Sequence, residues 1–313
     1  DFTAALLRAR GPVLATAGNL NNHLGVPLTL ARLESDHVSA VIECGMSAPG
    51  EIAPLVAMAR PHIAAVTNAG TAHLENFAHV DDIAKEKAAV YSTLTTGDVA
   101  VAPASDPRLI DPAARTGARV RLFGDGEGSH SRAHDLSMDL EGSNFGWRLD
   151  DREHAVRLKA PGPHAVSNFL IASLIAEAAG VAPATIVGAA SSLEPAANRG
   201  RVKRLADEIL LIDDTYNANP KAMRAALETL ALAHGRRRVA CLADMLELGP
   251  DGPALHREVG AALAGRADLL LTAGPLAREI AALDLKKEFD AKKKAILKRV
   301  DIRINDAELG KIK

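Results

Sequence analysis

Polar side chains that can bind a metal ion or a phosphate follow two apolar runs in the first third of the chain. Glu43 ends the first run, and Asn68 and His73 follow the second. In an open parallel sheet, ligands bind beyond the carboxyl ends of the strands, so we expect these side chains at one edge of the sheet. Lys87 lies on a helix predicted over 81–94, which leads away from the same edge. A carboxylate, an imidazole and a lysine that converge there suggest a site for a nucleotide and a metal ion.

The elements that must position these side chains alternate between apolar strands and helices. Strands are predicted around Glu43, before Asn68, and at 99–103 and 120–123, with helices at 1–10, 27–33, 50–60, 81–94, 106–115, 165–179 and 183–193. Continuous apolar strands in such an alternation are typical of a parallel sheet covered by helices on both faces. The segment 136–158 differs, because its looser alternation around Gly142-Ser143-Asn144 predicts an antiparallel extension that carries Trp147. The first domain is expected to span 1–197.

A second, smaller domain is expected over 198–283. A buried strand is predicted at 208–214, and it ends in Asp213 and Asp214. It is followed by a helix at 220–233, a strand at 238–243, a helix at 252–264 and a strand at 269–272. The fold class is therefore α/β, with a mostly parallel-sheet central domain, a small antiparallel extension and a Rossmann-like second domain.

The last segment, 284–313, is rich in lysine and of uncertain origin. Its apolar residues Leu285, Phe289, Ile296 and Val300 could share one face of an amphipathic helix. The plain expectation is a solvated helix, and the alternative is a helix that binds a partner or a membrane surface.

Bulk properties exclude several classes of protein. A chain of 313 residues predicts two domains, and a net charge of −2 does not favour a surface for nucleic acid or membrane. No apolar run approaches the roughly 20 residues of a membrane span. Cys44 and Cys241 both lie in apolar runs, so we expect two buried thiols in a reducing, cytoplasmic compartment. We expect a monomer.

Short stretches between residues 15 and 279 resemble those of the Mur ligases, the ATP-dependent amide-forming enzymes of peptidoglycan assembly. The stretches are 16–22, 41–46, 49–52, 72–77, 162–164 with Asn168, 200–201, 213–220 and 243–249. Each is weak alone, but together and in this order they are specific. The Asn-Leu-Asn-Asn loop at 19–22 and the stretch 213–220 point to the family member that adds a dipeptide.

The resemblance implies a central ATPase-type domain and a two-step reaction. The carboxylate of UDP-N-acetylmuramoyl-tripeptide would attack the γ-phosphate of ATP and become an acyl phosphate, and the amine of D-Ala-D-Ala would then attack that carbonyl. Catalysis of this kind consists mainly of positioning and charge neutralisation. The resemblance also implies two Mg²⁺ ions and a role in cell-wall synthesis, hence in cell shape and division.

The resemblance assigns roles to individual residues. Glu43, His73 and Lys87 would hold the metal ions. Lys87 would be carbamylated, since a free ammonium beside divalent cations is unfavourable, whereas Lys85 would be an ordinary surface lysine. Arg201 would reach the γ-phosphate when the second domain closes. Asn168 would lie near adenine, and the nucleotide would also be faced by Asp214, Tyr216 and Asn217. The muramoyl-peptide path would be lined by Asn19, Asn21 and Asn22, which could instead form turns.

Three further residues match the family and are equally compatible with structural roles: Asp244, Glu247 and His256.

Two parts of the family pattern are expected before Asp1. These are a phosphate loop of the Gly-x-x-Gly-Lys-Thr/Ser type and the domain that holds the UDP end of the substrate. A polypeptide of residues 1–313 alone is therefore expected to lack ligase activity, to bind Mg-ATP poorly and to aggregate. The alternatives are a ligase like folylpolyglutamate synthase and an inactive structural fragment. The sequence does not determine whether the acceptor peptide ends in lysine or diaminopimelate.

Overall fold

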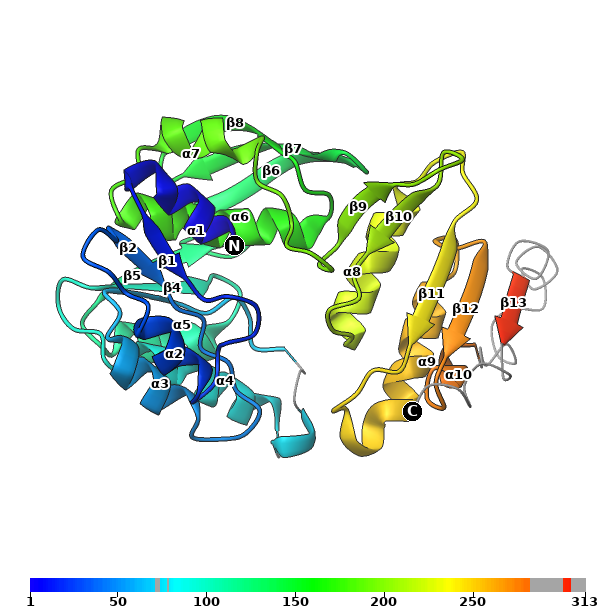
Figure 1. Ribbon diagram of the computed structural model, residues 1–313, viewed down its shortest axis with the longest axis horizontal. Coiled ribbons are helices and arrows are strands. Elements are labelled where there is room, and N and C mark those ends of the chain that lie inside the picture. Colours follow the sequence, from blue (N-terminus) through cyan, green and yellow to red (C-terminus); the bar gives the residue numbers. More distant parts are fainter. Residues whose placement is uncertain (71–73, 78, 282–300, 305–313) are drawn as a thin grey trace. The chain divides into compact units, whose positions relative to one another are not determined.

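A computed structural model describes residues 1–70, 74–77, 79–281 and the backbone of 301–304. The chain divides into two compact units, Asp1–Pro195 and Ala196–Lys313 (Figure 1). In the part of the chain that the structure describes, no helix is long and apolar enough to span a membrane.

The first unit is built on a six-stranded sheet. Its strand order is β3 (Ile63–Ala65), β4 (Val99–Pro103), β5 (Arg119–Phe123), β6 (Ser131–Asp139), β7 (Gly142–Leu149) and β8 (Arg152–Leu158). Strands β3 to β6 run parallel, and β6, β7 and β8 run antiparallel. A separate parallel pair consists of β1 (Val13–Ala15) and β2 (Ser39–Val41). The predicted α/β class, with a mainly parallel sheet and an antiparallel extension, is confirmed.

Helices cover both faces of the parallel strands. The described α-helices of the first unit are α1 (Phe2–Leu7), α2 (Gly25–Leu30), α3 (Ile52–Ala59), α4 (Val80–Ala88), α5 (Pro107–Ala114), α6 (Pro163–Ala178) and α7 (Pro183–Ala190). Side chains alternate across β4 as the period of a strand requires. Val99 and Val101 pack in the cluster that contains α1 and α6, whereas Ala100 and Ala102 pack with α4 and α5. This arrangement leaves the two ends of the strands to carry the loops.

The turn predicted at Gly142–Asn144 is wrong. β6 and β7 are joined at residues 140–141, and Gly142 pairs with Asp139 inside the ladder. The Asp139 carboxylate accepts the backbone N–H groups of Glu141 and Gly142 at 2.8 and 2.9 Å, which closes the turn two residues earlier. Gly142 has a φ of 154°, and a Cβ there would collide with the carbonyl oxygen of Leu158. The glycine thus marks a close approach of two strands.

The second unit contains two small sheets. β9 (Arg201–Arg204) and β10 (Leu210–Asp213) form an antiparallel hairpin, and β11 (Val239–Ala243), β12 (Leu269–Ala273) and β13 (Asp301–Ile304) run parallel. The helices are α8 (Pro220–Ala231), α9 (Gly252–Ala262) and α10 (Arg278–Ala281). β9 was not predicted. The predicted amphipathic helix at 285–300 lies outside the described residues, and β13 follows that segment.

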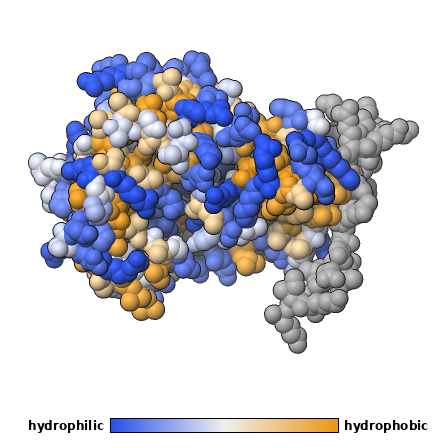
Figure 2. Space-filling view, turned by 45° about the horizontal axis from the view of Figure 1, so that its top comes forward, coloured by the Kyte–Doolittle hydropathy of each residue, from blue (hydrophilic) through white to orange (hydrophobic). Residues whose placement is uncertain are grey.

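Two burial predictions are wrong. The strand β10 is not buried, since Leu211 is 42% exposed. Among the described residues, β10 pairs with β9 alone. Cys241 is exposed on β11, which has β12 as its described neighbour, and Cys44 is half-buried. Both strands leave alternate side chains at the surface. Figure 2 shows apolar residues interspersed with polar ones on the visible face.

Candidate functional site

Glu43 lies in the loop that follows β2, where two loops meet. Its backbone N–H donates to Oγ1 of Thr16, directly after β1, at 2.9 Å. Its Oε1 accepts a hydrogen bond from Nδ2 of Asn21 at 2.8 Å. The backbone N–H of Gly45 donates to the Asn21 carbonyl at 2.7 Å, and a Cβ on Gly45 would overlap the Asn21 side chain. The structure therefore brings the predicted residues Asn21 and Glu43 together, with the Glu43 side chain exposed.

The cysteine beside Glu43 is not a candidate nucleophile or metal ligand at neutral pH. Burial, together with the charge of Glu43, raises the pKa of the Cys44 thiol to about 11. Only a thiolate attacks or ligates readily. Cys44 instead packs against the apolar cluster formed by Met46, Ile52 and Ile83, among others.

Lys87 reaches the loop that follows β3. Its Nζ donates to the backbone carbonyl of Asn68 at 2.8 Å. Lys87 is half-buried, whereas Lys85 on the same helix is exposed. The Asn68 side chain is used locally, since its Oδ1 accepts the N–H of Gly70 at 3.2 Å. His73 lies outside the described residues.

Among the described side chains of this site, Glu43 could provide one ligand to a Mg²⁺ ion. Glu43 offers a hard carboxylate oxygen at the end of a strand, and Mg²⁺ commonly takes its remaining ligands from water and phosphate. Lys87 as an ammonium is a hydrogen-bond donor and not a ligand. Within residues 1–70, 74–77 and 79–281, no three His, Cys, Asp or Glu side chains form a group that could hold a metal ion.

Arg108 is a residue of this edge that sequence reasoning missed. Its guanidinium pairs with Asp106 at 2.7 Å and with Asp81 on α4 at 3.0 Å, and it donates to the Ala69 carbonyl at 3.4 Å. Hydrogen bonding from Arg108 holds the pKa of Asp106 below its ordinary value. The dipeptide Asp106-Pro107 is a recognisable helix start. The reach of Arg108 to the loop after β3 could not be inferred from it.

The asparagines of the 19–22 loop make different contacts. Asn22 is a turn former, because its Oδ1 accepts the N–H groups of Leu24 and Gly25 at 3.1 and 2.9 Å and so begins α2. Asn21 reaches Glu43, as described above, and Asn19 is exposed. Asn168 is also exposed, on α6, whose N-cap is Gly162.

In the second unit, the predicted residues gather at one end of the β9–β10 hairpin. Arg201 pairs with Asp213 in the ladder, and Asp214 to Asn217 follow directly. The Asp213 carboxylate accepts from Lys203 Nζ at 2.7 Å and from Thr215 Oγ1 at 2.8 Å, and these bonds lower its pKa. The Arg199 guanidinium lies 3.8 Å from the centre of the Tyr216 ring, a cation–π contact that the sequence did not predict.

The loop after β11 is held by hydrogen bonds to α9 and to the segment before α10. The fully buried His256 accepts the Met245 N–H on Nε2 at 2.9 Å, and its Nδ1 bonds to the Gly252 carbonyl at 2.7 Å. Nδ1 must therefore carry the proton. Asp244 Oδ1 accepts the Ala277 N–H at 2.6 Å. His256 and Asp244 thus have a structural use, while Glu247 adopts a positive φ of 61° in the same loop.

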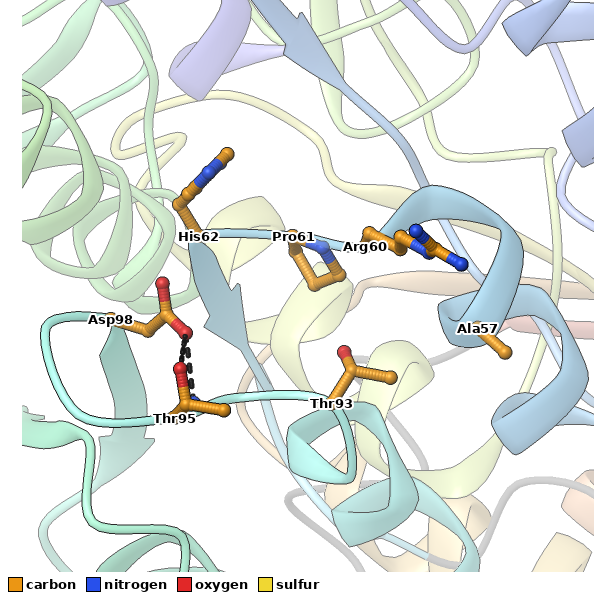
Figure 3. A pocket seen from close by; sticks show the side chains of 7 residues that line it. All are labelled: Ala57, Arg60, Pro61, His62, Thr93, Thr95 and Asp98. Atoms are coloured by element: carbon orange, nitrogen blue, oxygen red, sulfur yellow. Dashed lines mark hydrogen bonds between the residues drawn. The ribbon is translucent and has the colours of Figure 1, made fainter.

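The described pocket lies at the other end of the sheet. It has a volume of about 520 Å³ and is lined by Ala57, Arg60, Pro61, His62, Thr93, Thr95 and Asp98 (Figure 3). His62 directly precedes β3 and Asp98 directly precedes β4, so the pocket is at the amino ends of these strands. Thr95 and Asp98 close their own turn with bonds of 2.8 and 3.0 Å. None of the predicted site residues lines it.

Family models cover both units. The Mur ligase middle domain matches residues 1–176, and the Mur ligase, glutamate ligase domain matches residues 198–308. The chain belongs to the Mur ligase family. The resemblance inferred from the short stretches is confirmed.

Two relatives of this chain are ligases of the same name. The UDP-N-acetylmuramoyl-tripeptide–D-alanyl-D-alanine ligase of Escherichia coli K12 is 34% identical over 99% of this chain and 69% of its own length. The ligase of the same name from Mycobacterium tuberculosis is 36% identical over 83% of this chain and 52% of its own length. The chain thus spans between about half and about two thirds of these relatives.

Solved structures agree in fold. MurF from Acinetobacter baumannii superposes with a TM-score of 0.86 at 31% identity, covering 98% of this chain and 65% of that one. MurF ligase from Thermotoga maritima, solved in complex with ADP, has a TM-score of 0.82 at 26% identity and covers 97% of this chain and 67% of that one. Folylpolyglutamate synthase from Thermotoga maritima, at 13% identity and a TM-score of 0.65, shares the fold alone.

Proposed function

We propose that the chain belongs to an ATP-dependent ligase that joins D-Ala-D-Ala to UDP-N-acetylmuramoyl-tripeptide through an acyl phosphate. The observation that carries this proposal is the match of both Mur ligase domains, in order, to a chain whose relatives of that name are 34 and 36% identical. We place the first domain at 1–197, the second at 198–283 and a tail at 284–313. The division into compact units at Pro195 supports the first boundary.

Glu43 is the proposed ligand of the Mg²⁺ that accompanies the β- and γ-phosphates. Its position after β2, its exposure and the bonds from Thr16 and Asn21 that fix its direction support this role. Mg²⁺ at this place would neutralise the charge of the transferring phosphoryl group. His73 and Lys87 are the proposed ligands of a second ion.

Lys87 is proposed to act as a carbamate. The neutral amine adds to CO₂, a C–N bond forms, and one proton leaves, so the product is an anion that can ligate a metal. The carbamate nitrogen keeps one N–H, which can continue to donate to the Asn68 carbonyl as Nζ does at 2.8 Å. The half-buried position supports Lys87 over Lys85.

The other predicted residues complete the proposed substrate sites. Arg201 binds the γ-phosphate, since a planar guanidinium suits phosphate oxygens, and Asp214, Tyr216 and Asn217 bind the nucleotide. The gathering of these residues at one end of the β9–β10 hairpin supports the assignment. Asn168 lies near adenine. Asn19 and Asn21, with Asn22 shaping the turn, line the muramoyl-peptide path.

A substrate panel tests the proposal. The assay uses a polypeptide that also contains the phosphate loop and the UDP-binding domain expected before residue 1, here called the complete polypeptide. Its release of phosphate from ATP is expected to require UDP-N-acetylmuramoyl-tripeptide and D-Ala-D-Ala together. Substrates ending in lysine and in diaminopimelate are both included, so that the preferred acceptor is read from the same experiment. Release that depends on a folate and glutamate would instead support a ligase like folylpolyglutamate synthase. Absence of release with every pair would contradict the proposal.

A further inference from the structure

Glu86, the neighbour of Lys87 on α4, uses both carboxylate oxygens on the start of a different helix. Oε2 accepts the backbone N–H of Gly50 at 2.8 Å, and Oε1 accepts the backbone N–H of Ile52 at 2.8 Å. Ile52 is the first residue of α3. A helix leaves its first N–H groups without partners inside the helix. Glu86 supplies those partners from a helix 34 residues further along the chain.

The start of α3 depends on this outside carboxylate. Glu51 is the N-cap residue, but its side chain makes no capping bond to α3. The Glu51 carboxylate turns back instead and accepts the N–H groups of Ser47 and Ala48 at 2.7 and 3.2 Å. Gly50 has a φ of 88°, which favours glycine at this position. Two carboxylates therefore fix the turn 47–52, and one of them comes from α4.

That turn ends the loop that carries Glu43. The loop is anchored at its beginning by Thr16 and Asn21, as described above. In its middle, Met46 packs in one buried cluster with Ile52 and with Ile83 of α4. Glu86 fixes the far end to α4, so the loop is held to the same helix by apolar packing and by two hydrogen bonds.

We propose that Glu86 is a positioning residue that sets Glu43 relative to Lys87 and thereby supports binding of the Mg²⁺–nucleotide. Successive residues of a helix point about 100° apart, and here one of them holds the Glu43 loop while the next holds the loop after β3. Helix α4, which carries Lys87, thus joins the loop that carries Glu43 to the loop that follows β3. The proposal rests on the function proposed above.

The test compares Glu86→Ala, Glu86→Gln and Lys85→Ala in the complete polypeptide. Lys85→Ala is the matched control, because Lys85 is exposed on the same helix. Three quantities are measured: amide hydrogen exchange at Gly50 and Ile52, the Kd of Mg-ATP by calorimetry, and the thermal midpoint. Glu86→Ala is expected to speed exchange at both amides at least about tenfold and to weaken Mg-ATP binding about fivefold or more. Glu86→Gln keeps one acceptor oxygen and should recover part of both effects, and Lys85→Ala should change neither.

Two results would overturn the proposal. Faster exchange and a lower thermal midpoint with an unchanged Kd for Mg-ATP would show that Glu86 only caps α3. Equal effects of Glu86→Ala and Lys85→Ala on the Kd would show that the contact to α3 is not what matters. Failure of the proposed function is recognised separately, because the wild-type protein would then bind Mg-ATP without releasing phosphate in the presence of D-Ala-D-Ala and the tripeptide substrate.

Discussion

At the scale of single residues, Lys85 is a matched control for Lys87. They lie two positions apart on α4, and the helix turns them to nearly opposite sides. Lys85 is exposed, whereas Lys87 is half-buried with Nζ 2.8 Å from the Asn68 carbonyl. Their chemistry is the same, so a difference between their variants measures what the position contributes.

Lys87→Ala is expected to lower ligase activity at least about 100-fold, because loss of a group that only supports a metal ligand already costs about 10- to 100-fold and Lys87 is proposed as a ligand itself. Small carboxylic acids such as formate and acetate should restore part of the activity, because they can replace the anionic carbamate. Lys85→Ala should leave activity within about twofold. Steady-state phosphate release with and without added acid checks this. Equal losses at both positions, or no recovery with acid, would contradict the carbamate assignment.

The sequence suggested candidate residues for the site but not how they are paired. Glu43 was proposed because it ends an apolar run, and Lys87 because it lies on a helix predicted to lead away from the same edge of the sheet. The bond between Asn21 and Glu43 joins residues 22 positions apart, and no local pattern predicts it. The contacts of Arg108 with Ala69 and of Glu86 with α3 depend on how α3, α4 and α5 pack, which spacing along the chain does not specify.

At the scale of elements, apolar patterning located strands well where they are buried and poorly where they are not. The fully buried strand β4 was predicted at its observed limits. The strand β9 was missed because three of its four residues are Arg201, Lys203 and Arg204, so no apolar alternation marks it. The turn between β6 and β7 was misplaced because glycine and asparagine suggested a turn, while the Asp139 side chain closes it earlier.

The antiparallel extension carries a pH-sensitive contact. The His134 ring bonds to Glu153 of β8 through Nε2 at 2.8 Å and to Asp135 through Nδ1 at 3.0 Å. A Cβ on Gly146, the cross-strand partner of His134, would collide with this ring. Hydrogen bonding to Glu153 and Asp135 raises the pKa of His134. The folded protein therefore holds this proton more tightly than the unfolded chain.

His134→Asn is expected to cost stability at about pH 6 and less at about pH 8.5. The stabilisation from a raised pKa is fully present below the unfolded value, about 6.5 for histidine, and is lost as pH rises through the folded value. The measurement is the difference in urea midpoint between wild type and variant at several pH values. A difference that is constant or grows with pH would refute the assignment.

At the scale of the whole molecule, the two units have separate cores. Trp147, the single tryptophan, is fully buried in the first, where its ring centre lies 5.3 Å from that of Phe169 and its Nε1 donates to Ser131 Oγ at 3.0 Å. Leu270 is buried in the core of the second unit with Met245 and Val259. Separate cores are expected to unfold as separate transitions.

Trp147→Phe is expected to lower the stability of the first unit by about 2 kcal/mol, through lost packing and the lost hydrogen bond from the indole Nε1 to the Ser131 hydroxyl. Leu270→Ala should lower the stability of the second unit by about 3 kcal/mol. Urea unfolding followed by far-ultraviolet circular dichroism checks both, with wild-type tryptophan fluorescence identifying the first unit's transition. A single transition that both variants shift equally would show that the units unfold together.

The most direct test of the account is an isotope transfer. UDP-N-acetylmuramoyl-tripeptide labelled with ¹⁸O in its terminal carboxylate is incubated with ATP, Mg²⁺, D-Ala-D-Ala and the complete polypeptide, and the released phosphate is analysed by mass. If the carboxylate attacks the γ-phosphate, one labelled oxygen must leave with the phosphate when the amine displaces it. The account predicts one ¹⁸O per phosphate, released together with the pentapeptide product. Phosphate released without the label, while the pentapeptide product forms, would contradict it.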